Sequence, residues 1–349
     1  MTLYERVGNI HIHTIHSDGT GDYHQLSEIA NDAGLDYLIV TDHNFHTSEK
    51  EGWYGATLVL TGEEVQDPAH AAENHYLVLD ANRTMAPHAG DPQRLIDTVQ
   101  RHGGLGFIAH PYEHSGRFID EPEINWNAWH AEGYDGLEIW NYMSEFKSYL
   151  NDPLTTLLYA LMPRLAIRGP YPETLDRWDK LLADGKVWAI GGSDAHGKTY
   201  RMGPFKRQVF AYRHLFRTVN THALLSARWS GDATRDAQHL YTALEQGRSF
   251  IGYDALAPTK GFRFHAQHGE KRYTMGDEIA ARQEVHFQVS TPSAAHLRLI
   301  HNGSCVAENE GDYLMYTSRS PGAYRVEALK RHLAVERGWI YSNPIFVTT

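Results

Sequence analysis

The sequence predicts a mixed α/β fold in two parts, a larger region of alternating strands and helices followed by a smaller region of strands. From Asn9 to about Tyr253, short β-rich runs alternate with stretches whose apolar residues recur every three or four positions. This pattern is typical of βα units around a parallel sheet or barrel. After about Ala257 the helical spacing disappears, and short strands joined by polar turns follow. We therefore expect one domain over residues 1–257 and a second over residues 258–349.

Each element of the first domain has a local signal. The seven expected strands are Asn9–His13, Tyr37–Asp42, Thr57–Gly62, His75–Asp80, Leu105–His110, Gly136–Asn141 and Val187–Gly192. Apolar spacing predicts helices over Tyr23–Ala33, Gln93–Arg101, Pro172–Ala183, Tyr212–Ser226 and Asp236–Gln246. Asp22 and Asp91 are suited to cap helix starts, and Gly34, Gly103 and Gly185 to end helices.

Two apolar segments and the second domain complete the prediction. Core packing is the expected role for most apolar residues of Trp126–Trp140 and of the helical stretch Phe146–Ile167. Asn302-Gly303 is a hairpin signal in the second domain. The strands expected there are Gly261–Gln267, Glu284–Thr291, His296–His301, Tyr313–Thr317, Ala323–Leu329 and Trp339–Val347.

Composition excludes several classes of function. The 349 residues carry a net charge of −11, and residues 258–349 carry +2, which leaves −13 on the first 257. Such acidity disfavours binding to a nucleic-acid polymer, because little basic surface is present to neutralise phosphates. The longest apolar stretch, Leu154–Ile167, is interrupted by Pro163 and Arg164 and is too short to span a bilayer, so no membrane association is expected.

The chain has 23 histidines but a single cysteine, Cys305. One cysteine excludes a disulfide framework within the chain and a cysteine-rich zinc module, and it is consistent with a reducing compartment. The first residues also lack the basic and apolar pattern of a secretory signal, so we expect a cytoplasmic protein. Cys305 itself is expected to be a small buried hydrophobe in the second domain.

The first expected strand contains His11 and His13. Because side chains alternate along a strand, both imidazoles should point to one face, where they could reach one metal ion. Taken alone, the pair is equally compatible with two hydrogen-bonded core histidines. Asp18 follows where the strand should turn into a loop, and its carboxylate is a hard ligand beside the imidazoles.

Further residues of ligand type stand at strand ends. In a βα barrel the carboxyl ends of the strands meet at one rim, where barrel enzymes place their sites. Polar residues scattered through a core would not occur at strand ends so regularly. We therefore expect a metal site. His75 fits less well, because it begins its strand. The segments concerned are Thr41-Asp42-His43, Gly62-Glu63-Glu64, His75, Ala109-His110-Pro111 and Gly192-Ser193-Asp194-Ala195-His196.

The motif series HIHTIHSDG, TDH, GEE, NHYLVL, AHPY and GGSDAHG resembles the PHP (polymerase and histidinol phosphatase) family of metal-dependent phosphoesterases. The resemblance covers roughly residues 8–255, with several motifs in the family's order. The later segments GRSFIGYDA, LRLIHNG, GAYRVEALK and WIYSNPIFV resemble a two-domain subgroup that includes carbaryl hydrolases. The resemblance implies a distorted (β/α)7 barrel followed by a β-sandwich domain.

The resemblance also implies a cluster of two to three divalent ions, manganese, zinc or iron. It favours Glu64 over Glu63, because the family pattern is Gly-x-Glu, and Glu63 would then be a solvated surface carboxylate. The first ion would be held by His11, His13, Glu64 and Asp194, the second by Glu64, His75 and His110, and the third by Asp18, His43 and His196.

Five further residues are candidates for other roles. His16 could pass a proton to the leaving group, although a solvated loop histidine is an equal alternative. Asp42 could orient His43 by accepting a hydrogen bond from its ring. Arg168, Lys198 and Arg201 lie near strand ends and could bind substrate oxygens, although solvated surface positions explain each of them more simply.

These observations favour a metal-dependent hydrolase acting on a small, anionic ester. The leading hypothesis is a phosphoesterase for a phosphorylated small molecule or nucleotide, with a metal-bridging hydroxide as nucleophile. The alternative is a carboxyl or carbamate ester hydrolase, since the same nucleophile serves both reactions. Convergent Arg and Lys in the pocket wall would favour phosphate, and an aromatic slot would favour an aryl ester. A third hypothesis is a non-catalytic binding module stabilised by metal.

Overall fold

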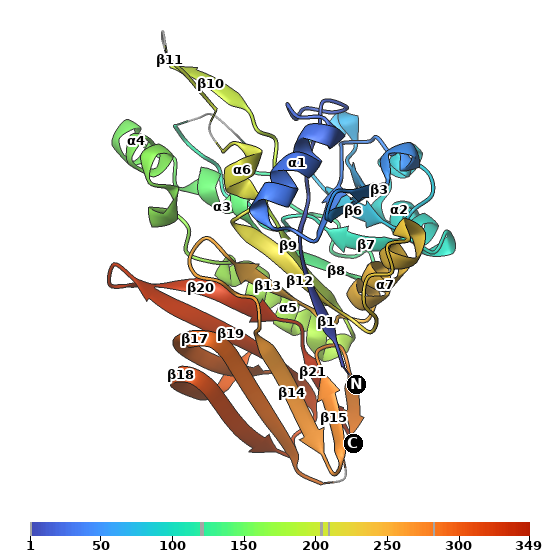
Figure 1. The fold of residues 1–349 in the computed structure, drawn as a ribbon, viewed down its shortest axis with the longest axis vertical. Coiled ribbons are helices and arrows are strands. Elements are labelled where there is room, and N and C mark those ends of the chain that lie inside the picture. Colours follow the sequence, from blue (N-terminus) through green and yellow to red (C-terminus); the bar gives the residue numbers. More distant parts are fainter. Residues whose placement is uncertain (1, 119–121, 203–204, 209, 282) are drawn as a thin grey trace.

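A computed structural model shows a mixed α/β fold with two large sheets (Figure 1). It describes residues 2–118, 122–202, 205–208, 210–281 and 283–349, and only the backbone of 199–202 and 205–208. The helices gather around the sheets of the first part, and the last strands of the chain form the other end of the molecule. None of the described helices is long and apolar enough to cross a membrane.

The strands divide at about residue 257. Those before it are β1 (Tyr4–Ile10), β2 (Tyr37–Val40), β3 (Gly52–Tyr54), β4 (Thr57–Thr61), β5 (Glu63–Val65), β6 (Tyr76–Leu79), β7 (Leu105–Ile108), β8 (Gly136–Asn141), β9 (Trp188–Gly192), β10 (Thr199–Met202), β11 (Phe205–Gln208), β12 (Val219–Leu225) and β13 (Ser249–Tyr253). Those after it are β14 (Arg263–His268), β15 (Lys271–Thr274), β16 (Glu278–Ala280), β17 (Val285–His301), β18 (Ser304–Ser318), β19 (Gly322–His332), β20 (Val335–Ser342) and β21 (Ile345–Thr348).

The described helices all lie before residue 246. The α-helices are α1 (Tyr23–Ala33), α2 (Pro92–Arg101), α3 (Tyr142–Ser148), α4 (Pro153–Leu161), α5 (Pro172–Asp184), α6 (Tyr212–Leu215) and α7 (Ala233–Glu245). Short 3-10 turns are η1 (Ser48–Lys50), η2 (Pro68–His70), η3 (Ala86–His88) and η4 (Pro163–Leu165).

The expected strands of the first part form two neighbouring groups. Strands β1, β2 and β4 pair in parallel within the larger sheet, and β5 to β9 form the second sheet in sequence order. Two isolated parallel bridges connect the groups, His43 with Glu64 and Ile12 with Ala195. The ends of β1, β2 and β9 therefore meet the start of β5 in one place, where the predicted ligands stand.

Strand β6 runs antiparallel to both of its neighbours, β5 and β7. The residue before it, His75, consequently lies at the same end of the sheet as the residues that follow β7 and β9. This reversal explains why His75 precedes its strand whereas other candidate ligands follow theirs.

The predicted caps of the first two long helices are confirmed. The Asp22 side chain accepts the backbone N–H of Gln25, whose side chain in turn accepts the backbone N–H of Asp22, forming a capping box. Asp91 caps α2 in the same manner through the N–H of Arg94. Gly34 ends α1 in the left-handed conformation, with φ of 77°, which glycine adopts without strain.

The helix predicted over Tyr212–Ser226 is wrong beyond its first turn. Helix α6 ends at Leu215, and β12 begins at Val219 and pairs antiparallel with both β1 and β13. Every residue of β12 is buried, so both faces of the strand are covered. A short run buried on both faces has no two-residue alternation, and its apolar spacing can imitate a helix.

Two hydrophobic clusters form the cores. One is built mainly from residues before 254, and the other mainly from residues after 261. The larger sheet nevertheless continues across the expected boundary, because β13 pairs antiparallel with β20. The two parts are therefore joined directly by backbone hydrogen bonds within one sheet, in addition to packing against each other.

Cys305 contradicts the prediction that it is buried. It lies on β18 and is exposed. Strand β18 pairs with β17 alone among the described strands, and much of its surface faces solvent. An edge strand of this kind buries few of its side chains.

A buried histidine network lies where the two parts meet. The fully buried His222 ring contacts Glu5 through Nδ1 at 2.9 Å, and its Nε2 lies 2.8 Å from Thr259 Oγ1 and 3.4 Å from Asp254. Burial would lower the pKa of His222, but Asp254 and Glu5 outweigh it and raise the pKa to about 9.

We expect His222 to stabilise the fold in a pH-dependent manner. Because its folded pKa of about 9 exceeds the ordinary 6.5, its contribution is complete below about pH 6.5 and is lost as pH rises through about 9. His222→Gln should therefore lower the free energy of unfolding by about 1–3 kcal/mol at acidic pH and much less above pH ~9.5. Urea unfolding at both pH values measures this, with His24→Gln on the exposed face of α1 as control. An equal loss at both pH values would contradict it.

Candidate metal centre

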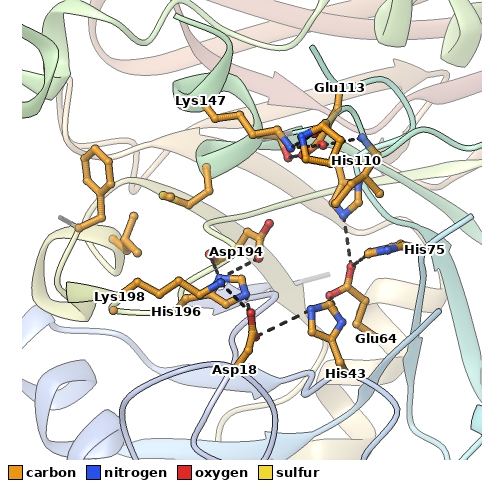
Figure 2. Close-up of a pocket in the computed structure, with 17 residues that line it drawn as sticks. Asp18, His43, Glu64, His75, His110, Glu113, Lys147, Asp194, His196 and Lys198 are labelled. Atoms are coloured by element: carbon orange, nitrogen blue, oxygen red, sulfur yellow. Dashed lines mark hydrogen bonds and ion pairs between the residues drawn. The ribbon is translucent and has the colours of Figure 1, made fainter. Parts of the chain in front are cut away.

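The buried carboxylate of Glu64 lies at the centre of the site (Figure 2). Its Oε2 lies 3.0 Å from His11 Nε2, 3.2 Å from His13 Nε2 and 3.1 Å from His43 Nδ1. Its other oxygen, Oε1, lies 2.6 Å from His75 Nδ1 and 3.2 Å from His110 Nε2. Five imidazoles from four chain segments thus surround one carboxylate.

Asp194 and Asp18 extend the cluster toward the pocket. Asp194 Oδ1 lies 3.5 Å from His11 Nε2, and 3.3 Å from both His13 Nε2 and His196 Nδ1. Asp18 Oδ1 lies 3.0 Å from His196 Nε2. All nine predicted ligands are therefore brought together. They form four overlapping groups with ligand atoms within 4.8 Å of one another, namely His13/Asp18/His43/His196, His11/Glu64/His110, His11/His13/Asp194 and His43/Glu64/His75.

Unpaired atoms at the centre of this cluster show that metal ions fit it. His11 Nε2, His13 Nε2, His43 Nδ1 and Glu64 Oε2 are buried and have no hydrogen-bond partner among the described residues, although each of the three nitrogens lies about 3 Å from Glu64 Oε2. Buried polar atoms are ordinarily paired. Nitrogen and carboxylate donors converging in this way suit manganese, iron or zinc.

The electrostatics also favour positive charge here. Burial would lower the pKa of His13, but Asp194 and Glu64 raise it to about 9. Burial is likewise outweighed at His110, where Glu64 raises the pKa to about 9. Burial would raise the pKa of Glu64, yet the surrounding imidazoles hold it well below its usual range. The carboxylates of the cluster are therefore ionised and attract cations.

The backbone is strained at three of these positions. His11, His110 and Asp194 have φ values of 68°, 25° and 54°, in a region that residues other than glycine seldom occupy. Each such residue costs about 1–3 kcal/mol. Strand β1 ends at Ile10, so His11 and His13 share a target through this turned backbone and not through regular strand alternation.

Glu138 holds two of the histidines in place. Its Oε1 lies 3.0 Å from His11 Nδ1, and its Oε2 accepts the backbone N–H of His110 and the side-chain amide of Asn141. Gly192 allows this packing, because a Cβ there would lie 2.8 Å from the Glu138 carboxylate. Glu138 and Asn141 stand in the GLEIWN segment, which sequence reasoning left without a role.

Asp42 does not contact His43 in this structure, and His16 is an exposed loop histidine, which is one of the two alternatives for it. Asp42 accepts hydrogen bonds from Thr14 and from Ser17 Oγ, so it fixes the loop after β1 and does not orient His43. Its side chain points back to that loop, whereas His43 faces Glu64. The exposed His16 ring stacks on Phe45 and lies outside the pocket lining.

The structure also corrects the prediction that Glu63, the residue before Glu64, is a solvated surface carboxylate. Glu63 is buried and not solvated. Its carboxylate accepts Thr84 Oγ1 and the backbone N–H of Met85, both at 2.6 Å, and burial raises its pKa. The strand does turn the two glutamates to opposite faces, but the segment containing Thr84 and Met85 covers the second face.

Seven of the nine ligand-type residues line a pocket of about 240 Å³. Two lysines stand on different sides of it: Lys198 beside Asp18, with Nζ 2.7 Å from Oδ2, and Lys147 beside Glu113, at 2.5 Å (Figure 2). Glu113 also accepts Ser144 Oγ and the backbone N–H of Ile124. The remaining wall is apolar and consists of Pro122, Ile124, Met143, Phe210 and Leu215.

Only one of the three predicted substrate residues is seen in this pocket. Lys198 lines it, whereas the exposed Arg168 does not. The side chain of Arg201 lies outside the described residues. Sequence reasoning missed Lys147, because it occupies a helix with no motif, and only the fold carries it to the site.

Comparisons with known proteins gave similar structures only. No protein-family model matches the chain, and no curated protein matches it significantly. A two-domain protein from Bacteroides vulgatus, containing a predicted PHP-like metal-dependent phosphoesterase, is similar with 15% identity and a TM-score of 0.49, covering 98% of this chain and 95% of that one.

Two further solved structures cover 56% of this chain. One, from Bifidobacterium adolescentis, is itself assigned only provisionally as a metal-dependent phosphoesterase, with 19% identity, a TM-score of 0.33 and 91% of its own length covered. The other is an amidohydrolase from Chromobacterium violaceum, with 14% identity, a TM-score of 0.29 and 92% covered. At these identities the likeness says nothing specific about the reaction of this chain.

We expect Glu138→Gln to weaken metal binding. The substitution removes the charge that fixes the His11 ring, and losses of such supporting carboxylates typically cost about 10–100-fold in metal affinity. Titration of the metal-free protein with Zn²⁺ or Mn²⁺ by calorimetry measures the change. Glu28→Gln on the surface of α1 is the matched control. Unchanged affinity in a folded Glu138→Gln protein would refute the positioning role.

Proposed function

We propose that the chain is a metal-dependent hydrolase that cleaves an ester of a small anionic molecule, most specifically a phosphoesterase. One observation carries this proposal: eight ligand-type side chains cluster with the buried Glu64 at the floor of an open pocket. The several overlapping ligand groups support a centre of two to three ions, whereas a structural site ordinarily needs one closed shell of ligands. A non-catalytic module would not need an adjoining pocket.

Divalent ions bound here would polarise the ester and lower the pKa of a water molecule toward neutrality. The protein supplies the rest of the machinery. His11, His13 and Glu64 form the buried base of the cluster, and Asp18 is its member nearest solvent. Asp42 fixes the loop that carries Asp18 by binding Thr14 and Ser17.

Lys147 supports the assignment to phosphate esters. An ammonium has three N–H donors, and Glu113 and the carbonyl of Pro122 take two of them. No acceptor for the third is found among the described residues, and it is suited to a phosphoryl oxygen in the pocket. Glu113 and Pro122 hold the ammonium in a fixed place, so little side-chain entropy is lost when substrate binds.

One observation favours the second candidate, a carboxyl or carbamate ester. The pocket wall of Pro122, Ile124, Met143, Phe210 and Leu215 is apolar, and no arginine lines the described part of the pocket. Such a wall would accept an apolar or aryl leaving group. The two candidates share the floor and differ in their dependence on Lys147.

We extend the proposal to the architecture. The two bridges that link the sheets support a distorted (β/α)7 barrel of the PHP type over residues 1–257. The separate apolar cluster supports a β-sandwich over residues 258–349. The single cysteine supports a reducing location, the cytoplasm.

We expect Asp194→Asn to reduce turnover by at least about 100-fold without unfolding the protein, because it removes the negative charge from the ligand group that Asp194 forms with His11 and His13. Protein loaded with Mn²⁺, Zn²⁺ or Fe²⁺ is assayed against phosphomonoesters, phosphodiesters, naphthyl acetate and naphthyl carbamates. The surface variant Asp184→Asn should retain full activity. If none of these esters were hydrolysed, the proposal would be wrong.

A double variant separates the two ester classes. Lys147→Met with Glu113→Gln removes both charges together and leaves no buried charge unpaired. For a phosphate ester we expect KM to rise about 10-fold or more with a smaller change in kcat, because a charge-assisted hydrogen bond is lost. KM for an aryl carboxyl ester should hardly change. Equal effects on both classes would remove Lys147 from phosphate recognition.

A further inference from the structure

Helix α4 exposes the side that a helix of a globular protein normally buries. Its leucines are Leu154, Leu157, Leu158 and Leu161, spaced i, i+3, i+4 and i+7, which places them on one stripe. Their relative exposures are 76%, 50%, 42% and 56%. The expectation that the apolar residues of this stretch pack in the core is therefore wrong for α4.

The side of α4 that faces the protein is the more polar one. Thr155, Thr156 and Tyr159 are half-buried, and the hydroxyl of Thr156 is buried without a hydrogen-bond partner among the described residues. No residue of the helix is fully buried. Unlike a normal surface helix, α4 thus turns its apolar side to solvent and its more polar side to the protein. It stands out at the edge of the molecule (Figure 1).

Apolar exposure is concentrated in this one segment. Of the ten large hydrophobic residues exposed in the described part of the chain, five lie between residues 154 and 162. Single exposed apolar residues are ordinary, but a contiguous group marks an interaction surface. The stripe of four leucines together with Met162 is called the leucine face below.

We propose that the leucine face binds the same face of a second copy of this chain, with the two helices antiparallel across a two-fold axis. A continuous leucine stripe at helical spacing fits another such stripe. The charges at its ends are complementary: Asp152 precedes α4 and Arg164 follows it. Antiparallel pairing places Asp152 beside Arg164 of the second copy at both ends, whereas parallel pairing would place like charges together.

A lipid surface fits the leucine face less well. Helices that lie in a membrane interface carry basic residues on their polar side. The polar side of α4 carries Thr155, Thr156 and Tyr159 and no basic residue. The net charge of −11 would also repel an anionic membrane.

The size of the face sets the expected affinity. Nine helical residues span about 14 Å. Their outer side supplies less than the roughly 800 Å² per partner that stable complexes bury. The dimer should therefore be weak, with a Kd on the order of 1–100 µM.

Sedimentation velocity of the metal-loaded, full-length protein from about 1 to about 300 µM tests the proposal. We expect a monomer–dimer equilibrium, weakened at least about 10-fold by Leu157→Glu with Leu161→Glu. Both side chains are half-exposed or more in the monomer, so the fold should persist, as checked by circular dichroism and the melting temperature. Met315→Glu with Leu333→Glu, at exposed positions on other elements, is the matched control and should leave association unchanged.

Cysteine cross-linking tests the direction of pairing. In a Cys305→Ser background, Leu154→Cys protein mixed with Leu161→Cys protein should form the mixed disulfide faster than either forms its own, because antiparallel pairing brings positions 154 and 161 together. Preferential pairing of 154 with 154 would overturn the antiparallel arrangement. A monomer at all concentrations would overturn the dimer, as would flotation of monomers with phosphatidylglycerol vesicles that the Leu157→Glu/Leu161→Glu variant loses.

Discussion

The structure of the site depends on one buried carboxylate. Glu64 is surrounded by five imidazoles, and its negative charge requires compensation that solvent cannot provide. Three of the five ring nitrogens that face it, those of His11, His13 and His43, lack hydrogen-bond partners among the described residues, so imidazole–carboxylate contacts alone do not satisfy the cluster. A cluster that needs cations to compensate its buried charge would destabilise an ordinary core. Beside an open pocket, it supports the proposed metal centre.

The fold brings the ligand side chains together and holds them in place by several means. Chain segments from two sheets end at the same place, joined by the bridge between His43 and Glu64. Left-handed backbone at His11, His110 and Asp194 turns their side chains inward, at a cost that the surrounding packing must offset. Glu138 then fixes the His11 ring from behind. The residues that position the ligand side chains therefore differ from Glu64, the carboxylate whose negative charge attracts cations.

The surface adds two features that the metal centre alone does not explain. The pocket combines a lysine held between Glu113 and Pro122 with an apolar wall, which suits an anionic ester with an apolar substituent. Helix α4 follows α3, the helix that carries Lys147, and it turns its leucines outward. The leucine face and the pocket residue Lys147 thus belong to consecutive helices.

The sequence by itself determined the seven expected strands of the first part, the caps at Asp22 and Asp91, and the ligand-type residues at strand ends, because these are local patterns. Tertiary structure decided the rest. The antiparallel direction of β6 brings His75 to the site, and pairing on both sides makes β12 a strand. Burial of Glu63, exposure of Cys305 and the reversed α4 depend on which surfaces are covered. Local periodicity shows which residues share a face, but only the complete packing decides what that face meets.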